Sequence, residues 1–253
     1  MKTLKKLISI AVLSLSIFAS NAAFAQDDFN KVFSQLDPKS LQPLTDAFSS
    51  DINSGLFHSS KVSKKFNLYF GVQAVSTAID EAPSSLKLTS VPFGIAQLTV
   101  GSLFGTDVSF RMLPKIVLGK YGSVSAMGFS LRHSITQYLK HAPVDGALQI
   151  AFEKLNLSDA QNNKIANSGS IAINLQFSKE ISIFTLYSGI QFEKTTIDYS
   201  FNYNGYPIAL TLENQNKVRG IFGLSVRLGP VNFNGDYDIC KNSSVSAGLG
   251  CAF

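Results

Sequence analysis

Apolar and polar residues alternate with a period of two through most of the chain. The clearest case is the last segment, where small or polar residues separate Val245, Ala247, Leu249, Cys251 and Phe253. A period of two is typical of a β-strand with one apolar face. The chain therefore ends in a strand, and a partner strand is needed to hold its last residue. We expect that partner near the start of the chain.

The same alternation recurs at intervals and predicts a series of strands. Phe66, Leu68 and Phe70, for example, share one face of a single segment. The pattern predicts strands over residues 48–57, 66–77, 93–103, 106–114, 122–133, 146–156, 168–178, 181–194, 215–228, 231–240 and 243–253. This is an odd number, whereas bacterial barrels have an even number of strands. One segment is therefore expected to be misassigned, and 48–57 and 93–103 are the weakest.

Several turns follow from the same pattern. A turn at Gly229-Pro230 would place Leu228 opposite Val231 and Arg227 opposite Asn232, so that apolar and polar faces both match. Another short turn is expected at residues 179–180. The Asn204-Gly205 dipeptide between aromatic residues is a strong hairpin signal, which we place outside the bilayer as an extension of its neighbouring strands.

Strand length and connections favour a membrane barrel over a secreted β-sandwich, which also alternates. Strands of about ten residues can cross a bilayer at a tilt. Short turns on one side and long polar connections such as residues 156–167 on the other are typical of outer-membrane barrels. A closed barrel also satisfies every backbone group in the bilayer. We therefore predict an all-β fold, an antiparallel transmembrane barrel of about 10–12 strands with a short N-terminal helix.

The first residues have the features of a secretory signal peptide over residues 1–25. Lysines come first, residues 7–18 are apolar, and Ala23-Phe24-Ala25 forms a small-x-small cleavage site. Residues 26–46 are expected to form a helical segment, because apolar residues fall at helical spacing over 27–36 and Pro38 follows. That helix could pack on the barrel rim or plug the lumen. The barrel itself is expected over residues 47–253.

Composition narrows the partners. Charged residues make up 15% of the chain, and no apolar run after the signal peptide is long enough for a membrane helix. No basic patch or zinc-finger spacing appears, so we expect no nucleic-acid partner. No phosphate loop, metal spacing or nucleotide fingerprint appears either, so we expect no cofactor.

The polar faces of the predicted strands carry charges of both signs, which we expect to face the lumen. The candidate lumen residues are Asp107, Arg111, Arg132, Glu153, Lys217, Arg219, Arg227, Asp236 and Asp238. Asp236 and Asp238 lie two residues apart on one face and could bind calcium or act as an acid–base pair. Pairing with Arg219 and Arg227 on the preceding strand is the simpler interpretation. A lumen of both signs would not be strongly ion-selective.

The histidines do not predict an enzyme. His133 and Ser134 are adjacent in a strand, so their side chains point to opposite faces and cannot act as a nucleophile and its base. His133 is expected on the lipid side near the strand end. His58 is expected to be solvated in a polar turn.

The cysteines and the aromatic residues give two further predictions. Cys251 is expected opposite Asn232 and Cys240 at the far end of the hairpin, too far apart for a disulfide, so both should be free thiols. The chain has no tryptophan. The aromatic belts of a membrane barrel must therefore come from Phe and Tyr, with Tyr187 and Tyr199 among the candidates.

The segments "LFGTDVSFRMLPKI", "GFSLRHSITQYL", "FTLYSGIQFE" and "INSGLFHSS" resemble an uncharacterised family of Gram-negative outer-membrane β-barrel proteins, a domain of unknown function. The resemblance covers most of the mature chain and implies fold and location, but no reaction. The ending with Leu249, Cys251 and Phe253 resembles the C-terminal signal read by the bacterial barrel-assembly machinery.

The expected location is therefore the outer membrane of a Gram-negative bacterium, with membrane lipid and the assembly machinery as partners. The expected function is a passive pore or carrier for small molecules, hydrophobic ones included, whose solute is unknown. One alternative is a structural or surface-interaction protein that binds through the hairpin at residues 199–206. The other is an outer-membrane hydrolase, which the histidines do not favour.

Overall fold

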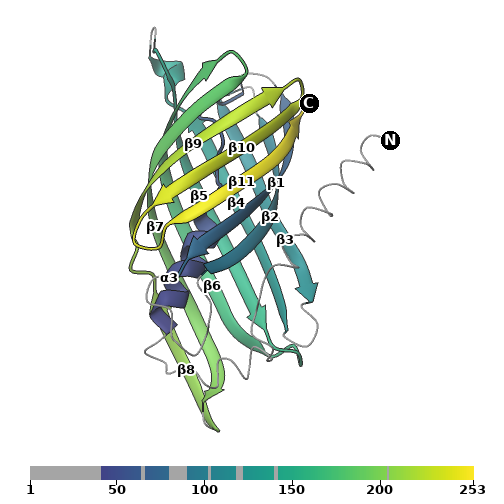
Figure 1. Ribbon diagram of the computed structural model, residues 1–253, viewed down its shortest axis with the longest axis vertical. Helices are drawn as coiled ribbons and strands as arrows, with labels where there is room; N and C mark the ends of the chain where they lie inside the picture. The colour runs from purple at the N-terminus through teal and green to yellow at the C-terminus, as the bar shows by residue number, and fades with distance from the viewer. Residues whose placement is uncertain are drawn as a thin grey trace, which may run out of the picture.

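The computed structural model describes residues 41–63, 66–79, 90–101, 104–117, 122–139, 142–203 and 205–253. The predicted signal peptide (1–25) and the predicted helix (27–36) lie outside these ranges. Within them the chain forms a closed antiparallel β-barrel with one α-helix inside it (Figure 1).

Ten of the described strands form the wall of the barrel. They are β1 (Asn67–Ala78), β2 (Ser90–Gly101), β3 (Thr106–Val117), β4 (Ser123–Ser134), β5 (Asp145–Ser158), β6 (Lys164–Ile181), β7 (Phe184–Tyr203), β9 (Val218–Leu228), β10 (Val231–Ile239) and β11 (Ser244–Ala252). Neighbours pair in chain order, except that β7 pairs with β9. Strand β8 (Tyr206–Glu213) pairs only with β7 and lies outside the ring.

Strand β11 closes the barrel on β1, as the alternation at the end of the chain predicts. Phe70 lies opposite Cys251 in this pairing. Leu68 and Phe253 also exchange two backbone hydrogen bonds, at 3.1 and 2.8 Å. The last residue is therefore held by the first strand, and the ring has no open edge through which strands could pair with another chain.

The barrel is polar inside and apolar outside. Phe110, Phe129 and Phe152 are exposed on the outer face, whereas Gln149 and Gln176 are buried inside. A soluble protein has the opposite arrangement, with apolar side chains buried and polar ones exposed. The closed ring and its reversed polarity together exclude the β-sandwich, and the predicted fold class is confirmed.

The strand expected over residues 48–57 is wrong. Helix α3 (Gln42–Asn53) occupies this part of the chain, and it crosses the boundary expected at residues 46 and 47. Pro43 stands in its first turn, where its missing N–H is not needed, and Leu44, Phe48 and Ile52 fall at helical spacing. The other weak segment does form a strand, β2. Removing 48–57 leaves the even number of wall strands that a barrel requires.

Two of the expected turns are shifted. Strands β6 and β7 continue to Ile181 and Phe184, so the turn lies at residues 182–183 instead of 179–180, and Ser182 has a φ of 58°. Strand β11 is shifted by one residue relative to β10, so that Cys251 lies opposite Val231 and not Asn232. The turn at 229–230 and its register are confirmed. Cys240 and Cys251 are both free, as expected.

The two ends of the barrel differ. The C-terminal mouth is the end formed by Phe253 and the turns at 182–183 and 229–230. The hairpin mouth is the opposite end, from which β7 and β8 project as a hairpin with Tyr203 opposite Tyr206 (Figure 1). The predicted hairpin is therefore present and extends beyond the ring. A 3-10 helix, η3 (Thr136–Tyr138), lies in the connection between β4 and β5.

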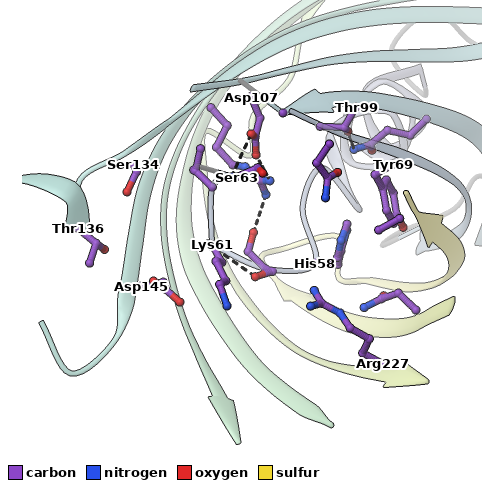
Figure 2. Close-up of a pocket in the computed structure, with 18 of the residues that line it drawn as sticks. His58, Lys61, Ser63, Tyr69, Thr99, Asp107, Ser134, Thr136, Asp145 and Arg227 are labelled. Atoms are coloured by element: carbon purple, nitrogen blue, oxygen red, sulfur yellow. Dashed lines mark hydrogen bonds and ion pairs between the residues drawn. The ribbon is translucent and has the colours of Figure 1, made fainter. Parts of the chain in front are cut away.

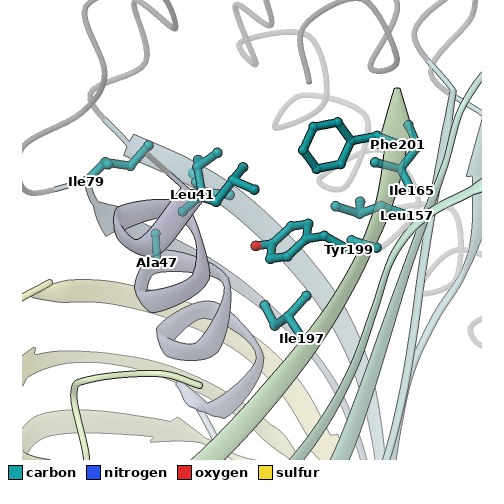
Figure 3. Close-up of a cluster of buried hydrophobic side chains, with 11 residues drawn as sticks. Leu41, Ala47, Ile79, Leu157, Ile165, Ile197, Tyr199 and Phe201 are labelled. Atoms are coloured by element: carbon teal, nitrogen blue, oxygen red, sulfur yellow. The ribbon is translucent and has the colours of Figure 1, made fainter. Parts of the chain in front are cut away.

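Helix α3 lies inside the barrel and contacts β1, β2 and β5 to β8. Its first turn packs at the hairpin mouth, where Leu41 joins a buried apolar cluster with Ile79, Leu157, Ile165, Tyr199 and Phe201 (Figure 3). Lower in the lumen, Ile52 packs against Val75, Ile95 and Leu155. In the described residues, no helix is long and apolar enough to cross a membrane. A helix does plug the lumen, but it comes from residues 42–53.

Candidate functional site in the lumen

Two arginines from the wall hold the C-terminal end of α3. Arg111 on β3 donates hydrogen bonds to the carbonyl oxygens of Ile52 (3.0 Å) and Ser54 (2.8 Å). Arg219 on β9 donates to the carbonyl oxygen of Ser50 (3.2 Å). The last carbonyls of a helix have no partner within it and carry partial negative charge. The last turn of α3 contains no basic residue, so the barrel wall provides the missing cations.

Carboxylates of the wall neutralise these two arginines. Arg111 pairs with Glu153 at 3.0 Å. Arg219 pairs with Glu193 at 2.7 Å and with Asp238 at 3.0 Å. All five side chains are only 1% exposed. Buried charges are tolerated only when they are paired and hydrogen-bonded, so these five residues, which we call the arginine latch, depend on one another and on the position of α3.

The rest of α3 is held mainly by neutral polar contacts. The contacts are buried hydrogen bonds from α3 side chains to wall side chains: Thr45 to Tyr199 (3.0 Å), Ser49 to Thr195 (2.7 Å), Asn53 to Ser170 (2.8 Å) and Asp51 to Thr77 (2.6 Å, with Thr77 donating). A helix in a polar lumen must satisfy its polar side chains through such bonds, because water is excluded. The contacts fix both the depth and the rotation of α3.

The chain continues from α3 through the lumen to the C-terminal mouth. Gly55 turns the backbone with a φ of +62°, and a Cβ there would collide with the side chain of Gln73. Beyond the turn, Ser225 donates to the carbonyl oxygen of His58 at 2.7 Å, and Arg132 donates to that of Ser59 at 2.5 Å. Residues 41–63, which we call the plug, therefore run along the lumen from one mouth to the other.

Most of the charged residues that were expected in the lumen lie there. Arg111, Glu153, Arg219 and Asp238 belong to the latch. The other buried or pocket-lining members are Asp107, Arg132, Arg227 and Asp236. Asp107 pairs with Arg132 at 2.6 Å near the C-terminal mouth.

Lys217 is an exception. Strand β9 begins only at Val218, so Lys217 lies in the connection before it and is exposed at the hairpin mouth. Its Nζ lies 3.4 Å from a carboxylate oxygen of Glu213. Hydrogen bonds from Lys194 and Lys217 lower the pKa of Glu213, which is itself exposed. The expectation that Lys217 faces the lumen is therefore wrong.

Asp236 and Asp238 have separate hydrogen-bond partners instead of forming a shared site. Asp236 accepts from the hydroxyls of Tyr187 (2.9 Å) and Ser246 (2.6 Å). Asp238 accepts from Ser54 at 2.6 Å in addition to Arg219. In the described residues, no group of three or more His, Cys, Asp or Glu side chains could hold a metal ion. Asp238 is therefore paired with an arginine, as the charge-pairing interpretation predicts, whereas Asp236 is held by hydroxyl groups.

The structure contradicts the predictions made for His58, Tyr187 and Tyr199. His58 is half-buried in the lumen, where its ring stacks on Tyr69 with 4.5 Å between the centroids, so the expected solvated turn is wrong. His133 shares a hydrogen bond of 2.8 Å with the hydroxyl of Thr106 on the neighbouring strand β3. Tyr187 and Tyr199 are buried inside the barrel and do not belong to an outer aromatic belt.

A pocket of about 570 Å³ lies at the C-terminal mouth, between the plug and the wall (Figure 2). The plug contributes His58 and Lys61 to its lining, and the wall contributes Tyr69, Arg132, Arg227 and Asn232. This volume lies within the usual range for small-molecule sites, about 300–1,000 Å³. Polar contacts thus fill the lumen around the latch, and space remains at the C-terminal mouth.

The plug residues are the functional residues that sequence reasoning missed. Ser49, Asp51 and Asn53 were assigned to a strand, although Pro43 and the helical spacing of the apolar residues indicated a helix. Glu193 was also missed as a latch residue. Its signal was the alternation along β7, where it follows Gln191 and precedes Thr195 on the same polar face.

Residues 76–253 match the family of unknown function DUF6588. A search of curated proteins found no match. Among solved structures, the translocator domain of the autotransporter NalP from Neisseria meningitidis is similar, with a TM-score of 0.41 and 10% identity over 85% of this chain and 95% of that one.

Two further structures are similar at the same level. Ail, the attachment invasion locus protein of Yersinia pestis, has a TM-score of 0.36 and 9% identity over 75% of this chain and 99% of that one. The β domain of the Bordetella autotransporter BrkA has a TM-score of 0.39 and 9% identity over 74% of this chain and 98% of that one. At these values none of the three supports a functional assignment.

Proposed function

We propose that this chain, which belongs to the family of unknown function DUF6588, is an outer-membrane pore or carrier and not an enzyme. Its plug closes the passage at rest, and small polar molecules pass when the plug is displaced. The observation that carries the proposal is the polar interface between plug and wall, centred on the arginine latch. A barrel of ten strands is narrow, so the solute must be small.

The outer face of the barrel supports a membrane location. Apolar side chains such as Phe129, Leu131 and Ile173 stay exposed around the ring, where lipid would cover them. Two-residue turns lie at the C-terminal mouth together with the longer β4–β5 connection, and the projecting β7–β8 hairpin lies at the other. Outer-membrane barrels place short turns in the periplasm, so the C-terminal mouth would face the periplasm. Export through the signal peptide and insertion by the barrel-assembly machinery, reading the last strand, are parts of the proposal.

The chemistry of the plug interface favours a displaceable plug over a permanent core. Hydrogen bonds between plug and wall can be exchanged for hydrogen bonds to water at modest net free-energy change. The bonds Ser49–Thr195 and Asn53–Ser170 are of this kind. An apolar interface of the same extent could not be hydrated without losing its burial free energy. The polar plug can therefore leave the wall without a large hydrophobic penalty along most of its length.

The test is to lock the plug to the wall and measure conductance in planar bilayers. Ser49 and Thr195 suit a disulfide, because their hydroxyl oxygens are 2.7 Å apart and a disulfide joins sulfurs at about 2.0 Å. The pair S49C/T195C would be placed in a C240S/C251S background. Conductance should disappear on oxidation and return with reductant, while S49C alone should be unaffected by either treatment.

Two results would reject the proposed function. One is conductance that persists unchanged in the oxidised lock, because solute would then not need the plug to move. The other is wild-type protein, shown to be folded by its heat-dependent electrophoretic mobility, that gives neither conductance nor solute uptake in liposomes. The first outcome would reject displacement of the plug and the second would reject transport, and both would leave the barrel fold in place.

A second candidate function rests on the projecting hairpin. Strand β8 and the end of β7 extend beyond the ring, and Tyr206 at the tip of β8 is 73% exposed. An exposed aromatic residue on a protruding hairpin suits recognition of a partner at the cell surface. Shortening the hairpin should then abolish cell-surface binding without altering heat-dependent mobility, whereas unchanged binding would exclude this role.

A further inference from the structure

Among the described cationic side chains that line the pocket at the C-terminal mouth, Arg227 makes the longest ion pair. Asp107 pairs with Arg132 at 2.6 Å, and Glu180 pairs with Lys61 at 2.6 Å. Arg227 remains: its side chain is 51% exposed, and its ion-pair partner, an oxygen of Glu180, is 3.8 Å away. That distance is beyond hydrogen-bond range, although a guanidinium offers five N–H donors. The carboxylates of Asp107 and Glu180 are therefore already engaged by other cations.

A buried amide lies directly beside this arginine. Asn232 is opposite Arg227 in the β9–β10 pairing, so both side chains project from the same face into the pocket. Asn232 is only 5% exposed, and its Oδ1 has no hydrogen-bond partner. A buried acceptor left unpaired raises the free energy of the protein. Because Asn232 lines the pocket, rotation of its side chain would bring this buried oxygen to a donor group on a bound molecule.

The rest of the wall sets limits on that molecule. The stacked rings of His58 and Tyr69 provide an aromatic surface next to these polar groups. Asp145 also lines the pocket, and Figure 2 places it on the side away from Arg227 and His58. A ligand that binds Arg227 therefore meets a cation, a hydrogen-bond acceptor and an aromatic wall, with the carboxylate of Asp145 on the other side.

We propose that this pocket binds a small organic acid that carries a hydroxyl group. Its carboxylate would pair with Arg227, whose planar guanidinium matches a carboxylate in two parallel hydrogen bonds. Its hydroxyl would donate to Oδ1 of Asn232. The site deepens the proposed transport function, on which it rests for the route of the solute, and gives that function a substrate class.

The test is calorimetric titration of the full-length mature barrel in detergent with three matched probes. Mandelate carries the carboxylate, the hydroxyl and a ring; phenylacetate lacks only the hydroxyl; mandelamide lacks only the charge. Mandelate should bind most tightly. R227Q should weaken mandelate binding by about tenfold or more, because a charge-assisted contact is lost. K217Q, which removes an exposed cation at the opposite mouth, should change nothing.

A separate substitution measures the contribution of the Asn232 amide to mandelate binding. N232A should reduce the affinity for mandelate to the affinity for phenylacetate, about three- to tenfold, and leave phenylacetate binding unaltered. Three outcomes would overturn the assignment: mandelamide binding as tightly as mandelate, mandelate affinity unchanged in R227Q, or no saturable mandelate binding by folded protein. Inorganic phosphate that displaces mandelate completely at equal concentration would also overturn it, because the site would then select charge alone.

The titration is independent of plug movement, so it can be separated from the transport test. Saturable mandelate binding together with the absence of conductance would support the site and reject the pore. Conductance without mandelate binding would support the pore and reject the site. Heat-dependent mobility of R227Q and N232A confirms that each variant is a folded barrel before its affinity is compared.

Discussion

The two mouths of the barrel are closed by different kinds of contact. At the hairpin mouth, Leu41 of the plug packs into the apolar cluster with Ile79, Leu157 and Tyr199, all nearly inaccessible (Figure 3). At the C-terminal mouth, the same plug runs between polar side chains and leaves a pocket of about 570 Å³ (Figure 2). Among the described residues, apolar packing predominates at one end, whereas polar contacts leave room at the other.

This difference indicates where opening would begin. Separating the apolar cluster at the hairpin mouth would expose apolar surface to water, which is unfavourable in proportion to the area. Polar contacts near the pocket can be replaced by water. The arginine latch lies between the two, and it holds the C-terminal end of α3 through charges that are fully buried. We therefore expect solute to enter from the C-terminal mouth and the latch to set the resistance to opening.

The largest effect is expected from breaking the latch. Arg219→Ala would leave Glu193 and Asp238 buried without their cation and would free the Ser50 carbonyl. Removing one partner of a buried ion pair typically costs about 3–5 kcal/mol. The free energy of unfolding in urea should fall by that amount, and amide hydrogen exchange in α3 should accelerate.

The matched control for this change is Arg227→Ala at the C-terminal mouth. Arg227 is half-exposed and makes only a long ion pair at 3.8 Å, so its loss should alter stability by less than about 1 kcal/mol. If the two variants were equally destabilised, burial of the latch would not distinguish the two regions. If Arg219→Ala left exchange in α3 unchanged, the latch would not hold the plug.

The latch also shows what could be predicted from the sequence. Side chains alternate between the two faces along each wall strand, so the face of one residue determines the faces of its neighbours. For this reason the alternation predicts that four latch residues lie in the lumen: Arg111, Glu153, Arg219 and Asp238. The prediction for Lys217 was wrong because alternation does not reveal where a strand begins.

The plug could not be predicted in the same way. Its polar residues Ser49, Asp51 and Asn53 are buried against partners on β1, β6 and β7, which are far away in sequence. In a polar lumen the polar residues of a helix are buried, whereas on a soluble core they face water. Pro43 and the spacing of Leu44, Phe48 and Ile52 were the available signals. The pocket depends on how the plug meets the wall, and no local pattern encodes it.

A smaller but still substantial effect is expected at the hairpin mouth. Leu41→Ala removes a fully buried side chain from the apolar cluster. Large-to-small changes of this kind typically cost about 2–4 kcal/mol, because burial is lost and a cavity remains. Urea unfolding should show the loss, and bilayer recordings should show more frequent opening. Leu139→Ala, at an exposed position in the β4–β5 connection, is the control and should have no such effect. Unchanged opening in Leu41→Ala would mean that this cluster does not seal the mouth.

A hydrogen bond at the same mouth should matter less than the apolar packing. Tyr199→Phe removes the hydroxyl that bonds to Thr45 at 3.0 Å but keeps the ring in the cluster. Thr45 also donates to the carbonyl oxygen of Leu41, so its hydroxyl keeps one partner. The expected loss is about 1 kcal/mol in urea unfolding. A loss as large as that of Leu41→Ala would show that polar contacts close this mouth as well.

The smallest effect is expected for the ion pair that joins the plug to the wall beside the pocket. Lys61 and Glu180 are 2.6 Å apart, closer than any pair of the latch, but their side chains are 52% and 31% exposed. Exposed ion pairs contribute about 0–1 kcal/mol and are screened by salt. Lys61→Gln should therefore change urea stability by less than about 1 kcal/mol, and the difference should vanish at high salt. Comparison with Arg219→Ala then distinguishes the effect of a short ion-pair distance from the effect of burial. Lys61→Gln with the larger loss would mean that short distance sets the strength of these contacts, whereas the expected order would mean that exclusion of water does.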